Sequence, residues 1–469
     1  MSKPSTAWIL INGKILTVDS NDSIAEAILI KDGKIQKVGS SEDIRGLAPE
    51  RVQELDLKGR TITPGFIDCH SHTAGYGFTL LGEDHARTRE FPVEDVEKAL
   101  LKAQEGLFKV GVTAQKEAGA TDVMIQAYKN LHARDELKLR SFLLYGIHLG
   151  QTSVELAQEA VNKHSPWGDD VLALRGVKCS LDGSASKRAP WLYEEYNKNY
   201  TEKDERHFGG LIVPEPQRHG EVVKILHRAG FQVCTHVHGD QAIDKYVDEI
   251  EAAIIDTPRT NCRHSVTHGT LPTDYALRKL VELGDNVVVE ASASYLYFLG
   301  EIFAGNFGPT RSRRLIPFRT WFERGIMVGN GADYESCDVN PMYALYSACT
   351  RRPQTGKYGS QPFGTDECLS VQQALRLCTI NSAYCMFWED QIGSLEPGKY
   401  ADLVVWSRDF IDLPSEELLN QKVELTMLNG EIVYSRALGR HRGGHRTEGK
   451  GDTGQSYRGG YFTDARPRH

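Results

Sequence analysis

The chain has 469 residues, of which 40% are apolar and 25% are charged, as in ordinary soluble globular proteins. This length exceeds that of a typical single domain, so we expect two domains, or one large barrel with an addition. The net charge of −8 argues against nucleic acid or an anionic membrane as a partner.

The sequence also bears on the compartment of the protein. Residues 1 to 6 lack the apolar core of a signal peptide, and no run approaches the ~18 apolar residues of a membrane-spanning helix. Several of the nine cysteines, such as Cys69 and Cys234, lie in apolar, strand-like stretches where buried thiols are the rule. These features predict a cytoplasmic location.

Residues 7 to 61 form short apolar runs separated by turn residues. The dipeptides Asn12-Gly13 and Asp32-Gly33 each indicate a β-hairpin. We therefore predict a small antiparallel β unit without helices at this end of the chain.

From residue 65, apolar strand-like runs alternate with amphipathic stretches, a pattern typical of a parallel sheet covered by helices. Eight units of this kind predict a (β/α)8 TIM-like barrel, and an open doubly wound sheet is the alternative. No glycine-rich phosphate-binding motif is present, so nucleotide binding is not expected. The eight runs are Gly65–His72, Val112–Gly119, Leu139–Leu149, Gly176–Gly183, Phe231–Gly239, Arg263–Gly269, Asn286–Ser294 and Gly325–Asp333.

After the barrel, a helix at Val371–Thr379 and a turn-rich link precede two further strands with Asn429-Gly430 in the turn between them. A β unit at each end of the chain predicts that the two ends pair into one small β-sandwich domain. The Gly- and Arg-rich C-terminal stretch is too polar to bury much surface and is expected to be flexible. The predicted parts are residues 1–64 (β-sandwich, first part), 65–388 (barrel), 389–436 (β-sandwich, second part) and 437–469 (tail).

Two histidines mark the end of the first barrel strand. Residues two apart in a strand point to the same side, so His70 and His72 would aim at one point, as the ligands of a divalent metal do. A pair of surface histidines at a strand exit is the alternative.

Other barrel strands also end in ionisable residues, which are costly to bury unless they are paired or bound to a metal. Packing alone does not readily explain so many of them at one barrel mouth. They are Lys178, His236, His238, His264, His268 and Asp333. Among them His264 lies deeper in the barrel, where we expect structural hydrogen bonding, whereas His207, His219 and His227 lie in polar contexts and are expected to be solvated.

These motifs resemble those of the metal-dependent amidohydrolase superfamily. The resemblance rests on Phe66–His72, on the histidines of the fifth and sixth runs, on Asp333 and on the stretch Gly393–Val404. Lys178 followed by Asp-Gly-Ser, and the stretch His236–Asp240, resemble the branch that contains N-substituted formamide deformylase and the YtcJ-like amidohydrolases.

The resemblance implies one or two divalent metal ions, with zinc the expected metal, and a homodimer. His70 and His72 would hold the first ion, His236 and His268 the second, and Asp333 would bind metal and act as general base and acid. Lys178 stands where binuclear members carry a carboxylated lysine that bridges the two ions; a salt-bridged or substrate-binding lysine is the alternative.

The seventh run departs from the branch, because Glu290–Tyr297 stands where many members carry Gln-Pro. Such departures lie where the substrate pocket should be, so specificity does not carry over. As candidate substrate contacts we take His238, Asp182, Arg188 and Tyr295, with an oxyanion or purely supporting role left open for His238.

The sequence thus predicts a metal-dependent hydrolase that cleaves a non-peptide, amide-type C–N bond of a small molecule with metal-activated water. The alternative is a deaminase of a C=N group on the same fold. Such enzymes usually carry a catalytic glutamate after the fifth strand, and no His-x-x-Glu follows here. A non-catalytic scaffold is disfavoured because every expected metal ligand is present.

Overall fold

The computed structural model describes residues 7–83, 91–147, 152–197, 208–354, 362–411 and 413–437. The chain divides into one compact unit that ends at Ser435 and a segment from Arg436 to His469. Apart from Ala437, the predicted tail lies outside the described residues. Among the described helices, none is long and apolar enough to cross a membrane.

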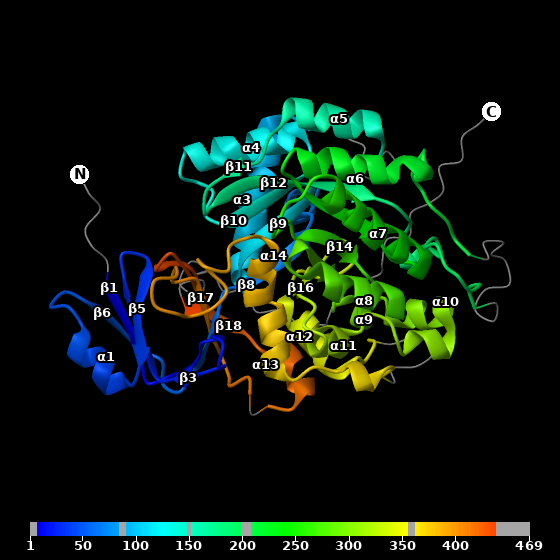
Figure 1. The fold of residues 1–469 in the computed structure, drawn as a ribbon. Helices are drawn as coiled ribbons and strands as arrows, with labels where there is room; N and C mark the ends of the chain where they lie inside the picture. The colour runs from blue at the N-terminus through cyan, green and yellow to red at the C-terminus, as the bar shows by residue number, and fades with distance from the viewer. Residues whose placement is uncertain are drawn as a thin grey trace. The chain divides into compact units, whose positions relative to one another are not determined.

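Eight parallel strands form the central sheet, and each strand pairs with the next one along the chain (Figure 1). Each of the eight predicted runs overlaps one of these strands, which confirms the predicted barrel. Their bounds are β8 (Phe66–Ser71), β9 (Val112–Ala120), β10 (Arg140–Gly146), β12 (Leu172–Ser180), β13 (Gln232–Val237), β14 (His264–His268), β15 (Val287–Ala291) and β16 (Val328–Asn330). A short strand, β11 (Trp167–Gly168), pairs antiparallel with β12.

The first and last strands of this sheet, β8 and β16, approach each other and nearly close the barrel. The backbone N–H of Asp333, just after β16, donates to the carbonyl oxygen of His70 on β8 at 2.9 Å. A Cβ atom at Gly331 would lie 2.3 Å from that of His70, so only glycine permits this approach.

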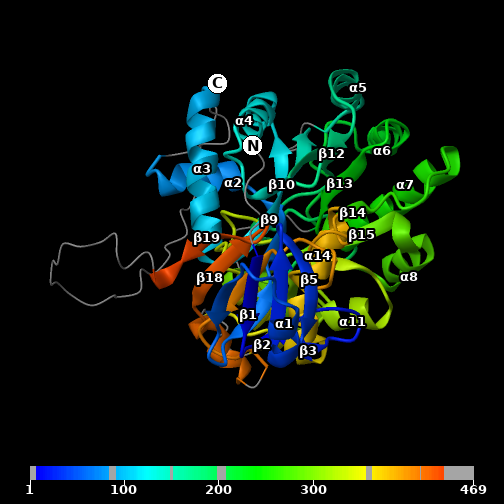
Figure 2. The ribbon, with the colours of Figure 1, turned by 90° about the vertical axis from the view of Figure 1, so that its left-hand side faces the viewer.

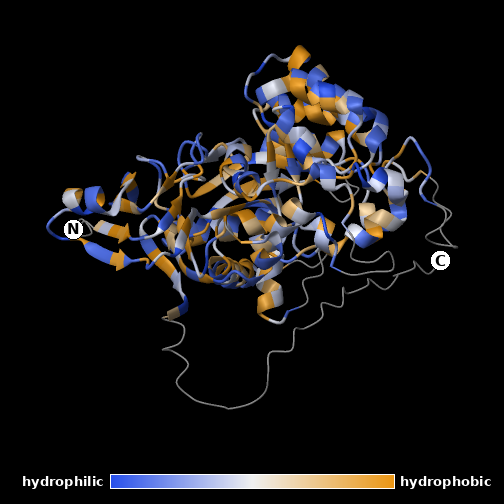
Figure 3. Ribbon diagram, turned by 90° about the horizontal axis from the view of Figure 1, so that it is seen from below, coloured by the Kyte–Doolittle hydropathy of each residue, from blue (hydrophilic) through white to orange (hydrophobic). Residues whose placement is uncertain are grey.

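Helices cover the outside of the barrel (Figure 1). In α3, buried residues recur at helical spacing, at Val96, Ala99, Leu100, Ala103 and Leu107, so one face packs inward. Figure 3 shows that the outer helices carry both apolar and polar residues. Their bounds are α2 (Thr73–Leu80), α3 (Val93–Lys109), α4 (Asp122–Ala133), α5 (Val154–Lys163), α6 (His219–Arg228), α7 (Asp240–Asp256), α8 (Asp274–Leu283), α9 (Tyr295–Phe298), α10 (Gly300–Ser312), α11 (Phe318–Glu323), α12 (Pro341–Thr350), α13 (Val371–Leu377) and α14 (Ile380–Cys385).

Two further sheets form a smaller β domain (Figure 2). One has the order β5-β4-β1-β6 and the other β19-β18-β17-β7-β2-β3. The second sheet joins the two ends of the chain, because Ile62 on β7 pairs with Val405 on β17. This confirms the predicted β domain built from both chain ends. The strands are β1 (Ala7–Ile11), β2 (Lys14–Leu16), β3 (Ile24–Ala25), β4 (Ala27–Lys31), β5 (Lys34–Gly39), β6 (Gln53–Asp56), β7 (Thr61–Pro64), β17 (Leu403–Trp406), β18 (Val423–Leu428) and β19 (Glu431–Ser435).

The N-terminal part differs from its prediction in two respects. The Asn12-Gly13 turn does not close a hairpin, because β1 pairs with β4 and β6 while β2 belongs to the other sheet. With both edges of β1 occupied, the chain crosses between sheets at this turn. The unit also contains a helix, α1 (Ser41–Leu47), and its β1–β6 pair is parallel. The hairpins predicted at Asp32-Gly33 and Asn429-Gly430 are present.

A buried ion pair ties the barrel to the β domain. Arg140, at the start of β10, donates from Nε to Oδ2 of Asp402 at 2.7 Å, and the two residues are 1% and 3% exposed. The same guanidinium also donates to Asn429 and to the carbonyl oxygen of Asp170. Because the opposite charges and the extra hydrogen bonds compensate the loss of water, this pair can remain buried.

Candidate metal centre

The first group of metal-ligating side chains combines His70 and His72, at the end of β8, with Asp333, which follows β16. Oδ1 of Asp333 lies 3.5 Å from Nε2 of His70 and 3.3 Å from Nε2 of His72. One ligand atom from each residue lies within 4.8 Å of the others, so the three could hold one ion. The expected convergence of these residues is therefore present in the fold.

The second group consists of three imidazoles. His236 lies on β13, His238 directly after it, and His268 at the end of β14. Their candidate ligand atoms also lie within 4.8 Å of one another. The ring centroids of His70 and His268 are 5.0 Å apart, so the two groups are neighbours at one barrel mouth.

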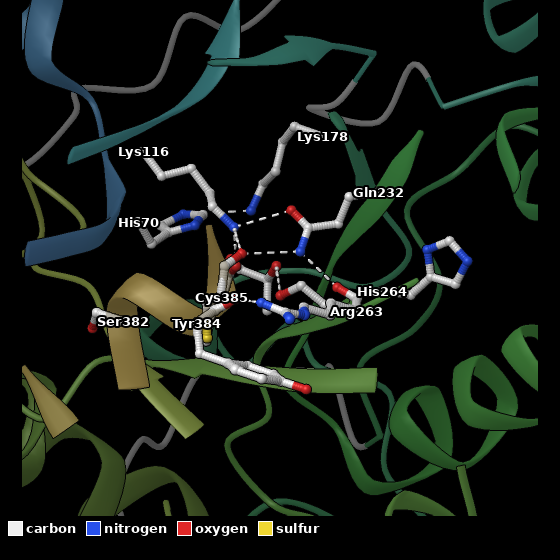
Figure 4. Close-up of polar contacts among 12 residues, drawn as sticks. His70, Lys116, Lys178, Gln232, Arg263, His264, Ser382, Tyr384 and Cys385 are labelled. Carbon is white, nitrogen blue, oxygen red and sulfur yellow. Dashed lines mark hydrogen bonds and ion pairs between the residues drawn. The ribbon is translucent and has the colours of Figure 1, made fainter. Parts of the chain in front are cut away.

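Lys178 extends from β12 and is 3% exposed. Its Nζ lies 3.4 Å from Nε2 of His70, a contact drawn in Figure 4. Burial lowers the pKa of Lys178 to about 8, although the negative charge of Asp333 acts to raise it. At mildly alkaline pH a substantial fraction of Lys178 would therefore be the neutral amine, the form that can be carboxylated.

The electrostatics of the centre suit metal ligands, because a histidine binds metal as the neutral imidazole and an aspartate as the carboxylate. Burial lowers the pKa of His238 to about 3 and holds the pKa values of His70, His236 and His268 well below the ordinary value. Burial acts to raise the pKa of Asp333, but the hydrogen bond with His72 and the surrounding imidazoles outweigh it, so this pKa lies well below its usual range.

Two residues of the centre have left-handed backbone conformations. The φ angles are 75° at His268 and 52° at Asp333, values that are uncommon for residues other than glycine. Such conformations persist where the surrounding structure enforces them, and they concentrate at functional sites.

Tyr295, at the start of α9, lies inside the centre and is 4% exposed. Its hydroxyl donates to Oδ2 of Asp333 and lies 3.4 Å from Nδ1 of His268. We predicted Tyr295 as a substrate contact from its position after the seventh strand; the structure also places it directly on the expected general base.

The other two candidate substrate contacts are buried and have partners within the chain. Asp182 accepts hydrogen bonds from the backbone N–H groups of Trp191, His238 and Gly239. Arg188 is 6% exposed and donates to the carbonyl oxygen of Asn197. These contacts account for the carboxylate of Asp182 without a substrate, and the role of both residues in substrate binding stays a prediction.

A third group, formed by His227, Cys262 and His264, lies among buried residues. Nδ1 of His264 accepts from the N–H of Val233, so the proton lies on Nε2, which donates to Nδ1 of His227 at 2.8 Å. Nε2 of His227 then donates to the carbonyl oxygen of Thr257. Since every imidazole nitrogen is used, this group is a structural hydrogen-bond chain, as we expected for His264.

The expectation that His219 and His227 are solvated is wrong. Both side chains are buried. Each has a polar partner there: His227 bonds to His264, and Nδ1 of His219 lies 2.6 Å from Oε2 of Glu249. These partners lie on other elements of the fold and leave no local signal in the sequence. His207 lies outside the described residues.

Sequence reasoning missed several polar residues around the centre. Asp68 accepts from the N–H groups of His70 and Ala332 and so joins β8 to the segment after β16. Lys116, shown in Figure 4, is completely buried and donates to Glu290 and Gln232. Asp68 and Lys116 could have been found from the sequence, because each is a charged residue within an otherwise apolar run.

Comparison with known proteins gives the same picture of the fold. The model of the amidohydrolase family matches residues 89–434. N-substituted formamide deformylase of Arthrobacter pascens is 22% identical over 91% of this chain and 98% of its own. An uncharacterized metal-dependent hydrolase from Pyrococcus horikoshii has a TM-score of 0.73 and 18% identity, over 88% of this chain and 99% of its own. An adenosine deaminase from Xanthomonas campestris with bound zinc has a TM-score of 0.59 and 17% identity, over 91% of this chain and 92% of its own.

Groups of side chains that could hold a metal ion thus lie at the carboxyl ends of the strands of a parallel barrel, where the active sites of such barrels lie. The family model spans most of the chain, and the chain belongs to the amidohydrolase family. The predicted enzyme class, an amidohydrolase acting on C–N bonds other than peptide bonds, is confirmed at this level.

Proposed function

We propose that the protein hydrolyses an amide-type C–N bond of a small molecule, with Asp333 as general base and acid. The observation that carries this proposal is the position of Asp333. Its carboxylate lies between the His70–His72 pair on one side and the Tyr295 hydroxyl on the other.

The side chains present suit a divalent metal such as zinc, because they offer neutral imidazoles and a carboxylate within reach of one another. His70, His72 and Asp333 would hold one ion, and His236 and His268 a second, for which a carboxylated Lys178 is one candidate further ligand. A metal held there would lower the pKa of a bound water and polarise the scissile carbonyl group.

The roles of the protein groups follow from their positions. Asp333 would accept the proton of the attacking water and then deliver it to the departing nitrogen. Tyr295, which donates to Oδ2, would hold the carboxylate in a single orientation through both transfers.

For the substrate class we favour an N-formyl or N-acyl amine. The support is the similarity over nearly the whole chain to a protein named as a formamide deformylase. Deamination is the second candidate, since an adenosine deaminase shares the fold. The absence of a glutamate in the stretch Val237–Asp240, after the fifth strand, disfavours it.

A substrate screen with metal-reconstituted protein separates the two reactions. It should include N-formyl and N-acyl amines, cyclic amides and aminopurines, with carboxylate release and ammonia release measured in parallel. We expect formate or another carboxylate together with an amine. Turnover of aminopurines alone, with release of ammonia, would show that the protein is a deaminase.

A further inference from the structure

Three imidazoles, not two, meet in the second group of the metal centre. We propose that His238 is a metal ligand together with His236 and His268, so that the second ion is held by three histidines and does not require carboxylation of Lys178. This inference rests on one part of the proposed function, namely that the centre binds metal.

The three rings lie against one another, with the ring of His236 edge-on to the other two and the rings of His238 and His268 stacked. The ring centroids are 4.6 Å apart for His236 and His238, 4.5 Å for His236 and His268, and 4.5 Å for His238 and His268. One nitrogen from each ring lies within 4.8 Å of the other two. Three neutral imidazoles are a donor set that zinc accepts in proteins, with a further position left for water or substrate.

The hydrogen bond of His238 suits a ligand. Nδ1 of His238 lies 2.6 Å from the hydroxyl oxygen of Thr270, a fully buried residue. Metal-binding histidines generally engage their other ring nitrogen in this way, which fixes the orientation of the ring. Nε2 then remains as the atom that can bind metal. In the chain formed by His227 and His264, by contrast, all nitrogens are used.

The backbone of His238 is held from two neighbouring segments. Its N–H donates to Oδ1 of Asp182 at 2.9 Å, and the N–H of Gly239 donates to Oδ2 of Asp182 at 2.8 Å. Its carbonyl oxygen accepts from the N–H of Leu271 at 3.2 Å. Asp182 and Thr270 are thus positioning residues that place the imidazole before any ligand arrives.

Lys178 is placed differently. Its Nζ contacts Nε2 of His70, a member of the first group. The second group therefore has a complete set of three nitrogen donors without this lysine. A site of this composition would load its ion without carbon dioxide, whereas a site bridged by a carboxylated lysine depends on it.

The test measures metal binding rather than turnover. Chelated, full-length protein is titrated with Co²⁺ in buffer free of carbon dioxide, and bound ions are counted by elemental analysis while the visible absorption of the cobalt is recorded. We expect wild type and Lys178→Met to bind two ions per chain. Thr270→Val, which removes only the hydroxyl that orients the imidazole, should lose about 10- to 100-fold in affinity for one ion. His238→Asn, which removes the proposed ligand itself, should lose more affinity for that ion and change the cobalt spectrum.

The matched control is His132→Asn, which removes an imidazole from α4 that bonds to Asp169 at the surface. It should retain both ions with unchanged affinity. Circular dichroism checks that each variant is folded. If His238→Asn does not fold, the metal affinity of Thr270→Val decides the test. Wild-type affinity for both ions in His238→Asn and Thr270→Val, or a single ion in Lys178→Met, would overturn the inference. Wild type that binds no ion would instead overturn the proposed function.

Discussion

The hydroxyl of Tyr295 donates a hydrogen bond to Oδ2 of Asp333, while Oδ1 of the same carboxylate faces the imidazoles of His70 and His72. The two oxygens of one side chain thus have different partners. Oδ1 is placed to bind metal, and Oδ2 is the oxygen available for proton transfer, held by a neutral donor.

Replacement of Tyr295 by phenylalanine tests this division. The variant keeps the ring and loses only the hydroxyl, so the fold and the metal content should be unchanged. Oδ2 of Asp333 then keeps the longer hydrogen bond from the Ser336 hydroxyl, at 3.3 Å, so the carboxylate is held less firmly. We expect kcat to fall about 10- to 100-fold, as for other groups that position a catalytic residue. Steady-state kinetics on the best substrate of the screen is the measurement. A variant as active as wild type would remove Tyr295 from the mechanism.

Asp333→Asn should have a larger effect on turnover. The amide can still place an oxygen near His70 and His72, but it cannot accept a proton. We expect kcat to fall about 10²- to 10⁴-fold, the usual contribution of general acid–base catalysis, while ions remain bound. Kinetics and elemental analysis of the same preparation give both quantities. Activity within tenfold of wild type would refute the assignment of the base.

Metal removal should destabilise the folded protein, because the candidate ligands come from separate strands that meet only in the native state. A ligand present at 100 times its Kd adds about 2.7 kcal/mol to the free energy of unfolding. Thermal unfolding of chelated protein should therefore shift upward as zinc is added back. His72→Asn serves as the comparison and should respond less; a wild-type melting temperature independent of zinc would contradict the prediction.

The Arg140–Asp402 pair should matter for stability alone. Asp402→Asn leaves a buried guanidinium without its counter-charge, a change that typically costs about 3–5 kcal/mol. Denaturant unfolding measures it, and activity per folded molecule should be unchanged. Arg134→Gln breaks an exposed ion pair with Glu97 and should change stability far less. Equal effects of the two substitutions would argue against the buried pair as the connection between barrel and β domain.

The His227–His264 chain predicts a pH effect. Burial holds the pKa values of both imidazoles below the ordinary 6.5. The unfolded chain therefore binds more protons than the native protein as the pH falls below about 6.5, and stability is lost in that range. His227→Gln removes one such group, so its free energy of unfolding should depend on pH less steeply, by up to about 1.4 kcal/mol per pH unit between pH 5.5 and 6.5. An equally steep pH dependence of the free energy of unfolding in the variant and in wild type would contradict this prediction. Measurements at pH 8 supply the reference, because residue 227 is neutral there in both the folded and the unfolded state.

The barrel could be predicted because fully buried parallel strands are continuous apolar runs, and the eight runs stand out from the amphipathic helices between them. The positions of His70, His236 and Asp333 followed from the same reading, since residues at the carboxyl ends of parallel strands meet at one edge. These predictions needed only local patterns and one rule of topology.

Other features depend on contacts between distant segments and could not be predicted. Asn12-Gly13 has the composition of a hairpin turn, but the two edges of β1 are taken by β4 and β6. His227 looks like an ordinary surface residue until His264 is placed beside it. The contact between Tyr295 and Asp333 depends on the short helix α9, whose orientation no local pattern specifies.

The hydrogen bond from Asp333 to His70 joins the first and last strands of the barrel. On the ribosome, His70 and His72 emerge while most of the barrel is still to be made, and Asp333 follows only with its last strand. A nascent or truncated chain therefore displays histidines without the carboxylate that completes their group. Because Asp333 is also the expected general base, a chain that ends before its last strand lacks both the third candidate ligand of this group and the base.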